Sequence, residues 1–367
     1  MHPGTVHGCC KLTLLLESTG CYDSVQCDWQ ARTGRVTDMP RQVVFHELGG
    51  ADVLKLEEQP LAEPGPGEVR IAVAAIGLNR AEVMFRMGHY LEQPEFPSRL
   101  GYEAAGVIDA VGPGVEGFAV GDRVSTIPAF SMLEYGVYGE SAIVPAHAVA
   151  RYPSNLTPAE GASIWMQYMT AYGALVHYGH VGAGTVVLIT AASSSVGLAA
   201  IQIVKAAGGV AIAATRGSGK KRALLDAGAD YVVVTDEESL AERVMEMTDG
   251  AGANIVFDPV VGPTLTDLAE AAARGATIYV YGALSPEPAT YPLLAALGKG
   301  LSIRGYVLFE ITGDPAGMEQ AKRFVYDGLE AGDLKPIVAR TFPLDEIVEA
   351  HRYMESNQQI GKIVVLT

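Results

Sequence analysis

The pattern of apolar and polar positions changes near residue 161. Before that point, short apolar stretches are separated by turn signals at close intervals, such as the Pro-Gly-Pro-Gly run at 64–67. This arrangement is typical of a compact β-rich barrel, which a short helix over 79–88 interrupts. The clearest strands predicted in this part cover residues 69–78, 106–115 and 120–127.

Beyond residue 161, strongly apolar strands alternate with helical segments, which predicts a doubly wound parallel sheet covered on both faces. Its predicted strands cover residues 186–190, 210–215, 231–235, 254–260, 276–282 and 302–308. The tail predicts two helices, 317–330 and 344–356, and a last strand at 360–367. We expect that last strand to pair back with the first domain, so that a ligand would bind between the two domains.

The predicted domain organisation follows from these patterns. Residues 39–160 with 311–367 form one domain, and residues 161–310 form the other. Residues 1–38 lack strand or helix periodicity, yet contain all four cysteines of the chain. We interpret this segment as an appended leader and expect the working protein to begin near Met39; a native N-terminus at Met1, with an ordered leader, would contradict this.

Length and composition narrow the class of protein. The 367 residues are enough for two domains with hydrophobic cores. The formal net charge of −16 argues against a nucleic-acid surface, which would carry a basic stripe. No apolar run reaches the roughly 18 to 20 residues that span a bilayer, so no membrane partner is expected. The absence of cysteine after Cys27 fits a reducing compartment and predicts a cytoplasmic location.

A loop of small residues follows the strand at 186–190. It reads Ala-Ala-Ser-Ser-Ser-Val-Gly and leads into a helical segment. Small residues leave the backbone open to phosphate, and the start of a helix favours an anion, so this loop predicts a dinucleotide site. The residues assigned to it are Ser193, Ser194, Ser195, Val196 and Gly197.

The next strand, 210–215, ends in cations instead of an acid. A site for NAD usually places an acid here for the ribose 2′-hydroxyl. This chain has Arg216, Lys220, Lys221 and Arg222, which are four cations within seven residues. Cations on an exposed helix start are usually just solvated, but a helix start favours anions, so their presence indicates an anionic ligand. The predicted cofactor is therefore NADPH.

Further candidates end the later strands at the same carboxyl edge of the sheet, where doubly wound sheets bind ligands. Asp258 and Val260 follow the fourth strand, although Asp258 is equally suited to cap the next helix. Tyr281 and Gly282 end the fifth strand. After the sixth, Val307, Leu308 and Phe309 are expected to face the nicotinamide, and Val307 and Phe309 are assigned to the site.

Six blocks, in this order and spacing, resemble the medium-chain dehydrogenase/reductase superfamily, specifically its zinc-free quinone oxidoreductase and enoyl reductase branch. The resemblance runs from about Met39 to Thr367. It implies an α/β fold in which a GroES-like β-barrel catalytic domain accompanies a Rossmann domain, and a homodimer built through the Rossmann sheet edge. The blocks are residues 75–90, 100–124, 169–175, 191–197, 257–262 and 361–366.

The zinc-dependent alcohol dehydrogenases of this superfamily hold an open zinc ion with a thiolate, an imidazole and a third ligand. At the matching positions this chain has Asn79, Tyr102 and Met166. An amide, a phenol and a thioether do not hold catalytic zinc, so no metal is predicted.

The resemblance also assigns residues to chemistry. Tyr90 matches a tyrosine implicated as a proton donor in enoyl reductases, and is equally suited to be a wall of the pocket. A tyrosine is protonated at neutral pH and can donate. Asn79 is expected to bond the cofactor or a substrate oxygen, and Thr170 the nicotinamide ribose or carboxamide. His89, Tyr102 and Tyr135 are further pocket candidates.

On the cofactor side, Lys220 matches a lysine that relatives use on the 2′-phosphate, with Arg216 and Ser218 in support. The loop of Asp258 is expected along the cofactor ribose. Lys362, in the matching block at 361–366, is also assigned to the cofactor site.

Together these features predict a zinc-independent, NADPH-dependent reductase of quinones or activated alkenes, acting on a small-molecule substrate. Two alternatives remain open. An enoyl-thioester reductase would need a basic rim, for which Arg80, Arg86 and Arg99 are candidates. A non-catalytic NADPH-binding sensor or structural protein would keep the same cofactor residues.

Overall fold

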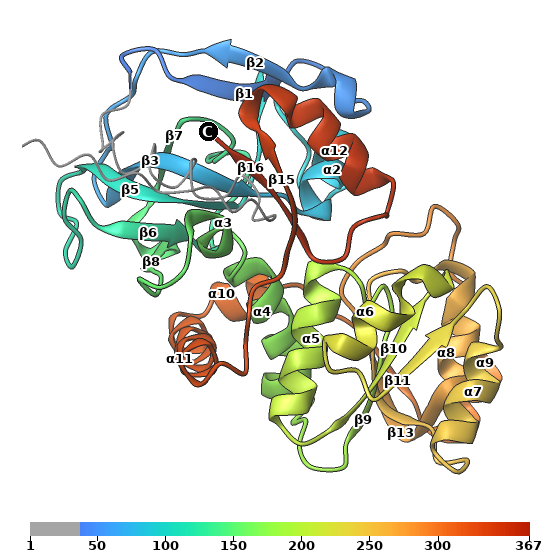
Figure 1. Ribbon diagram of the computed structural model, residues 1–367. Coiled ribbons are helices and arrows are strands. Elements are labelled where there is room, and N and C mark those ends of the chain that lie inside the picture. The colour runs from blue at the N-terminus through green and yellow to red at the C-terminus, as the bar shows by residue number, and fades with distance from the viewer. Residues whose placement is uncertain (1–36) are drawn as a thin grey trace, which may run out of the picture.

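The structure is a computed structural model that describes residues 37–367. The predicted leader lies outside the described residues, except for its last two positions. Figure 1 shows two domains, one built around strands β3, β5 and β16 and the other around β9, β10 and β13, with α4 between them. No helix of residues 37–367 is both long enough and apolar enough to cross a membrane.

The first domain is a β-rich barrel with short helices at its edges. A three-stranded sheet, β2-β1-β4, accompanies a seven-stranded sheet in which β15-β16-β3-β5-β6-β8 are neighbours and β7 also pairs with β3. The strands are β1 (Arg41–Phe45), β2 (Lys55–Glu58), β3 (Glu68–Gly77), β4 (Ser98–Arg99), β5 (Glu103–Val111), β6 (Arg123–Thr126), β7 (Ser141–Pro145), β8 (Val149–Arg151), β15 (Val338–Pro343) and β16 (Lys362–Leu366). The helices are η1 (Ala51–Val53), α2 (Arg80–Arg86), η2 (Ala146–Ala148), α3 (Pro158–Gly161), η6 (Leu344–Glu346) and α12 (Ile347–Glu355).

Strand β3 is the centre of the barrel, because it pairs with β5, β7 and β16. Eight of its ten residues are buried, which explains its nearly unbroken apolar sequence. A Cβ atom on Gly106 would lie 2.0 Å from the carbonyl oxygen of Ala72, so only glycine allows β5 to approach its partner strand β3 this closely at that point.

The second domain is a parallel sheet with the order β11-β10-β9-β12-β13-β14. The strand order reverses between β9 and β12, which is where such sheets bind their ligands. Its strands are β9 (Val186–Ile189), β10 (Val210–Thr215), β11 (Tyr231–Val234), β12 (Ala253–Asp258), β13 (Ala272–Val280) and β14 (Ser302–Gly305). The helices within residues 165–331 are α4 (Trp165–Tyr172), the π-helical η3 (Gly173–Tyr178), α5 (Ser195–Ala206), η4 (Ser218–Lys220), α6 (Lys221–Asp226), α7 (Leu240–Met247), η5 (Gly262–Thr264), α8 (Leu265–Ala271), α9 (Leu293–Lys299), α10 (Phe309–Thr312) and α11 (Pro315–Ala331).

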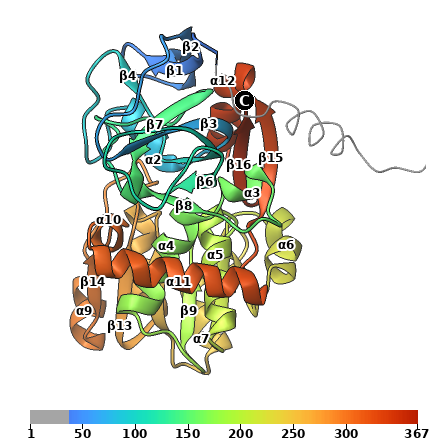
Figure 2. The same cartoon turned by 90° about the vertical axis from the view of Figure 1, so that its left-hand side faces the viewer.

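The α/β fold, with a GroES-like barrel and a Rossmann sheet, is confirmed. The predicted return of the last strand to the first domain is also present, since β16 pairs antiparallel with β3. Residues 311–331 were predicted in the barrel domain, and that assignment stays a prediction. Met318, Ala321 and Val325 of α11 are buried in a core cluster that contains residues of both domains. Figure 2 shows α11 lying across the Rossmann domain, and it packs on α4.

Candidate functional site

The loop of small residues lies at the carboxyl end of β9, where the sequence placed it. The Ser194 hydroxyl accepts a hydrogen bond from the amide of Gly197 at 3.0 Å and so caps helix α5. A Cβ atom on Gly197 would lie 2.6 Å from the Cα of Ala192, so glycine is required for the helix to start this close to the strand. Ser195 and Val196, in the first turn, are partly exposed.

The segment after α12 lies against this loop. The Gly361 amide donates to the carbonyl of Ser193 at 3.0 Å, and Gly361 forms an isolated β-bridge with Ser194. The Lys220 ammonium joins the same segment, because it donates to the carbonyls of Asn357 at 2.6 Å and Gln359 at 2.9 Å, and to the Ser193 hydroxyl at 3.0 Å. The C-terminal segment thus connects the barrel to the predicted phosphate loop.

Two more cations approach this place. Arg80, at the start of α2, donates to the carbonyl of Met354 at 2.7 Å and to the side chain of Asn357. Burial, and then the nearby charge of Arg216, lower the pKa of Lys220. Burial also lowers the pKa of Arg80, against the opposing charge of Glu355 and with a smaller contribution from Arg216. Within residues 37–367, none of these three cations forms an ion pair with a carboxylate. Ser218, at the start of η4, is exposed beside them.

Asp258, at the end of β12, is fully buried and holds the loop that follows it. Its carboxylate accepts the amides of Val260 at 3.0 Å and Val261 at 2.8 Å, as well as the Thr190 hydroxyl. Asp258 therefore holds the loop but caps neither η5 nor α8, whose N-cap residues are Val261 and Thr264 without a side-chain cap. Val260 remains partly exposed at the sheet edge, so contact of this loop with a cofactor ribose stays a prediction for Val260.

Tyr281 follows β13 at the same edge. Its ring stacks on Phe257 with the centroids 4.0 Å apart. Its hydroxyl is buried and makes no well-formed hydrogen bond among the described residues, although the Ser194 side chain lies near it. Burial raises its pKa well above the ordinary value, against the opposing effect of Ser194. A buried donor without a partner is costly unless a ligand satisfies it. Gly282 follows, and a Cβ atom there would lie 3.0 Å from the Cβ of Pro259.

Residues that follow β14 contact the barrel domain. Val307 is 40 % exposed. The ring of Phe309, at the start of α10, lies 5.9 Å from the ring of Tyr102 in the barrel domain. Phe309 thus lies at the junction of the two domains, and Val307 is exposed two residues before it.

These residues fit a dinucleotide that carries an extra phosphate. The capped start of α5 offers backbone donors to an anion. The Tyr281 hydroxyl offers a donor inside the site, and Arg80, Arg216 and Lys220 offer positive charge that forms no direct ion pair with a carboxylate of the described residues.

On the barrel side of the junction lies a buried polar network made by Asn79, Glu82, Glu103 and Lys362. The Lys362 ammonium is fully buried and binds the Glu103 carboxylate and the side-chain oxygen of Asn79, the latter at 2.5 Å. The Asn79 side-chain nitrogen donates to the carbonyl of Gly77 and to both glutamates at 3.1 to 3.3 Å. Every polar side-chain atom of Asn79 and Lys362 thus has a partner within the protein.

Glu82 is the member of this network whose pKa is shifted toward neutral pH. Burial raises the pKa of Glu82 to about 7, against the opposing effects of Lys362 and of hydrogen bonds from Asn79 and Tyr102. Its carboxylate accepts the Asn79 amide at 2.6 Å at the start of α2. Near neutral pH, therefore, Glu82 is protonated for part of the time.

The network changes how two predicted site residues are understood. Asn79 and Lys362 were expected to contact the cofactor or the substrate, but each is bonded internally. Contact with a ligand would require one of those bonds to break, so their ligand roles stay predictions. Sequence reasoning missed Glu82 and Glu103, although the Asn-x-x-Glu spacing at 79–82 is a capping signal.

The three positions that match zinc ligands are all bonded within this network. Asn79 belongs to it, the Tyr102 amide donates to Glu82 at 3.2 Å, and the Met166 amide donates to Glu103 at 2.9 Å. Residues 37–367 contain no group of three His, Cys, Asp or Glu side chains that could hold a metal ion.

Tyr90 and Tyr102 form a hydroxyl pair with their oxygens 3.4 Å apart. Tyr102 is fully buried, whereas Tyr90 is partly exposed. Burial raises the pKa values of both phenols, so both are protonated at neutral pH. The predicted proton donor is therefore present in its protonated form at the domain junction.

Other predicted residues are bonded within the protein or lie at the surface. The Thr170 hydroxyl donates to the carbonyl of Met166 at 2.5 Å, and the Tyr135 hydroxyl donates to Glu68 at 2.8 Å. His89 is exposed. Arg86, a candidate for a basic rim, is fully buried and paired with Glu355, so that expectation was wrong for Arg86.

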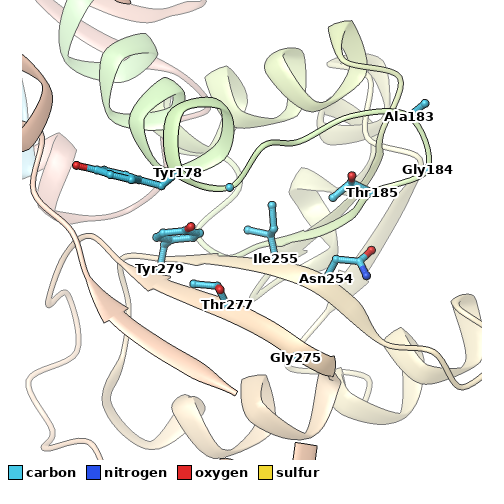
Figure 3. Close-up of a pocket in the computed structure, with 10 residues that line it drawn as sticks. Tyr178, Ala183, Gly184, Thr185, Asn254, Ile255, Gly275, Thr277 and Tyr279 are labelled. Atoms are coloured by element: carbon cyan, nitrogen blue, oxygen red, sulfur yellow. The ribbon is translucent and has the colours of Figure 1, made fainter. Parts of the chain in front are cut away.

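A hollow of about 460 Å³ lies on the opposite edge of the Rossmann sheet. Figure 3 shows it between Tyr178 and Tyr279 at one end and Thr185 and Asn254 near the other. Thr185 and Asn254 lie at the starts of β9 and β12, away from the carboxyl edge. None of the predicted site residues lines this hollow.

Two known families match the chain. Residues 65–154 match the alcohol dehydrogenase GroES-like domain, and residues 227–365 match the zinc-binding dehydrogenase family. The first covers part of the barrel, and the second covers much of the Rossmann sheet and the C-terminal segment.

Individual proteins match over nearly their whole length. Human quinone oxidoreductase is 33% identical over 89% of this chain and 97% of its own length. A 2-haloacrylate reductase from Burkholderia is 31% identical over 89% of this chain and 99% of its own length. The structure of Escherichia coli quinone oxidoreductase complexed with NADPH superposes with a TM-score of 0.82 at 28% identity, covering 89% of this chain and 100% of that one.

Proposed function

The chain belongs to the medium-chain dehydrogenase/reductase superfamily, in its zinc-free quinone oxidoreductase branch, and we propose that it reduces quinones or activated alkenes with NADPH. An oxidoreductase activity is supported by quinone oxidoreductase relatives. The 2-haloacrylate reductase relative supports an alkene conjugated to a carbonyl as one class of acceptor.

One observation carries the choice of cofactor. Lys220 is partly buried beside the phosphate loop and donates only to neutral acceptors, with Arg216 and Arg80 nearby. Positive charge held this way is best satisfied by an anion that arrives with the ligand. The 2′-phosphate of NADPH supplies that anion, and NADH does not. NADPH-bound structures of related proteins support the same choice.

When bound, NADPH supplies a hydride to the acceptor. The chain's own residues would do the rest. The start of α5 and the cations hold and orient the phosphates, while Val307 and Phe309 border the reacting end. Tyr90 offers a protonated phenol that can bond the acceptor's carbonyl oxygen and stabilise the charge that develops there.

NADPH oxidation by the full chain tests the proposal. The acceptors are a 1,4-quinone, a 2-alkenal and a crotonyl thioester, each with NADPH and with NADH. We expect turnover with the quinone or the alkenal, and faster turnover with NADPH. Tight NADPH binding without turnover on any acceptor would contradict the enzyme and favour a non-catalytic NADPH-binding protein.

Turnover on the thioester alone would favour an enoyl-thioester reductase. One observation supports this alternative: Arg99 is exposed and makes only a long hydrogen bond, to the carbonyl of Glu134 at 3.4 Å. Since Arg86 is buried, the basic rim that a thioester carrier needs is incomplete.

We also propose a homodimer through the edge of the Rossmann sheet. Strand β14 is the edge strand, and the neighbouring helix α9 exposes apolar side chains, with Leu294 84 % exposed and Leu297 73 % exposed. Such a patch is typical of an interface. Light scattering should give twice the chain mass, and Leu294→Glu should give a monomer; a monomeric wild-type chain would contradict this proposal.

A cytoplasmic location is proposed as well. It rests on the lack of any cysteine after Cys27, which suits a reducing compartment. Fractionation of the native host would check it, and recovery of the protein outside the cytoplasm would contradict it.

A further inference from the structure

We propose that Tyr102 is a positioning residue that orients the Tyr90 hydroxyl so that its proton faces the substrate. The proposal rests on the proposed function for its substrate, but its geometry stands on the residues of the barrel. It assigns a role to the phenol of Tyr102, which stands where zinc-dependent members of the superfamily carry a metal ligand.

The backbone of Tyr102 is fixed on both sides. Its amide donates to Glu82 at 3.2 Å, and its carbonyl accepts the Thr126 hydroxyl at 2.7 Å. Its ring lies against Phe130 and Phe309, with centroid distances of 5.7 and 5.9 Å. Tyr102 therefore has little freedom to move its hydroxyl.

The direction of the hydrogen bond follows from burial. The Tyr102 hydroxyl is fully buried, and among the described residues its only hydrogen-bond partner is the Tyr90 hydroxyl, at 3.4 Å. A buried hydroxyl that fails to donate is costly, so Tyr102 donates and Tyr90 accepts. Tyr90 must then direct its own proton elsewhere, and its exposed side at the domain junction is where a ligand can approach.

The same bond assists the proton transfer. After hydride addition has turned the unsaturated carbonyl into an enolate, the O–H bond of Tyr90 breaks and the proton moves to the enolate. The electron pair stays on the Tyr90 oxygen as a phenolate, which the Tyr102 hydroxyl stabilises by donating to it. A proton taken up from bulk solvent then restores the Tyr90 hydroxyl, so each turnover consumes one hydride from NADPH and one solvent proton.

Three phenylalanine variants test the assignment. Tyr90→Phe and Tyr102→Phe each remove one hydroxyl of the pair. Tyr138→Phe is the matched control, because Tyr138 is a buried tyrosine of the same domain whose hydroxyl has no partner among the described residues. All three variants and the double variant are assayed on a 2-alkenal with saturating NADPH.

For the alkenal, Tyr90→Phe should lower kcat about 100-fold, the scale of general acid catalysis. Tyr102→Phe should lower kcat about 10-fold with little change in KM, the scale of one hydrogen bond. The double variant should be no slower than Tyr90→Phe, because Tyr102 acts only through Tyr90. An unchanged kcat in Tyr102→Phe, or a double variant showing the product of both losses, would overturn the proposal.

A second readout does not depend on turnover. In spectra of protein labelled at the tyrosine Cζ with ¹³C, the Tyr90 signal is the one that Tyr90→Phe removes. That signal should shift in Tyr102→Phe and stay in place in Tyr138→Phe. If the wild type turns over no acceptor, the proposed function fails while these spectra still decide the pairing; an unmoved Tyr90 signal in Tyr102→Phe would refute it.

Discussion

Lys362 and Lys220 lie on the two sides of the domain junction and are bonded in opposite ways. Lys362 is fully buried and is paired with the buried carboxylate of Glu103. Lys220 is only partly buried and donates to two carbonyls and one hydroxyl, with no carboxylate partner among the described residues. The first charge is neutralised by a carboxylate of the fold. The second has its three N–H donors on neutral oxygens and no carboxylate partner among the described residues, so we propose that an anion of the ligand replaces one of these bonds. The two lysines thus differ in whether a carboxylate of the fold pairs with them.

The largest effect expected from this comparison is the loss of Lys362. Lys362→Met would leave Glu103 buried without its cation, which costs about 3 to 5 kcal/mol in the free energy of unfolding. Urea unfolding of the variant measures the loss. The control is Lys322→Met, which breaks an exposed pair with Glu319 and should cost less than about 1 kcal/mol. Equal losses of unfolding free energy in the two variants would contradict the claim that Lys362 stabilises the fold through its buried pair.

His351 is a buried polar side chain without a partner among the described residues, and it lies inside the barrel domain. It therefore shows what such a group costs where no ligand is expected. His351 is fully buried beside Tyr138, and neither ring nitrogen has a partner among the described residues. Burial, and then the charges of Arg86 and Arg80, lower its pKa to about 3. Because the folded pKa lies below the unfolded value of about 6.5, the wild type loses stability as the pH falls from 6.5 toward 3.

His351→Leu should therefore raise the free energy of unfolding by about 1 to 2 kcal/mol at pH 7. The advantage should grow by up to about 1.4 kcal/mol for each pH unit below 6.5, and NADPH affinity should not change. Urea unfolding at pH 7 and pH 5 measures this, with the exposed His147→Leu as control. A stability gain that is the same at both pH values would rule out the buried neutral imidazole.

The smallest effect concerns the Tyr281 hydroxyl, at the junction itself. Tyr281→Phe should change the unfolding free energy by less than about 1 kcal/mol, because no well-formed hydrogen bond among the described residues is lost. It should weaken NADPH binding about 5-fold, since a neutral hydrogen bond has that scale. Calorimetric titration with NADPH measures the affinity. Unchanged affinity would show that the Tyr281 hydroxyl does not bind the cofactor.

The sequence was sufficient for the fold and for the position of the small-residue loop between β9 and α5, because both depend on local signals. Apolar strands with small-residue turns predicted β9 and the start of α5, and the cations after β10 were visible as a run. The polar network was not predictable, since Lys362 meets Asn79 across 283 positions of the chain. For the same reason, Lys362 was assigned to the cofactor and Arg86 to a rim, although pairing with distant carboxylates buries both.

The Tyr90–Tyr102 pair shows the same limit. Each tyrosine was recognisable as a pocket candidate, but Tyr102 follows Gly101, which adopts a φ of 108° after β4. A Cβ atom there would lie 2.1 Å from the ring of Tyr138. Packing of this kind becomes visible only in three dimensions.

The affinities of the wild type and of Lys220→Gln for NADPH and NADH test the account most directly. Nicotinamide fluorescence on titration gives both dissociation constants. We predict that the wild type binds NADPH at least about 10-fold more tightly than NADH, as expected for a charge-assisted contact, and that Lys220→Gln removes most of this preference while keeping its affinity for NADH. Equal affinity of the wild type for the two cofactors, or an undiminished preference in Lys220→Gln, would contradict the claim that this cation is held for the 2′-phosphate.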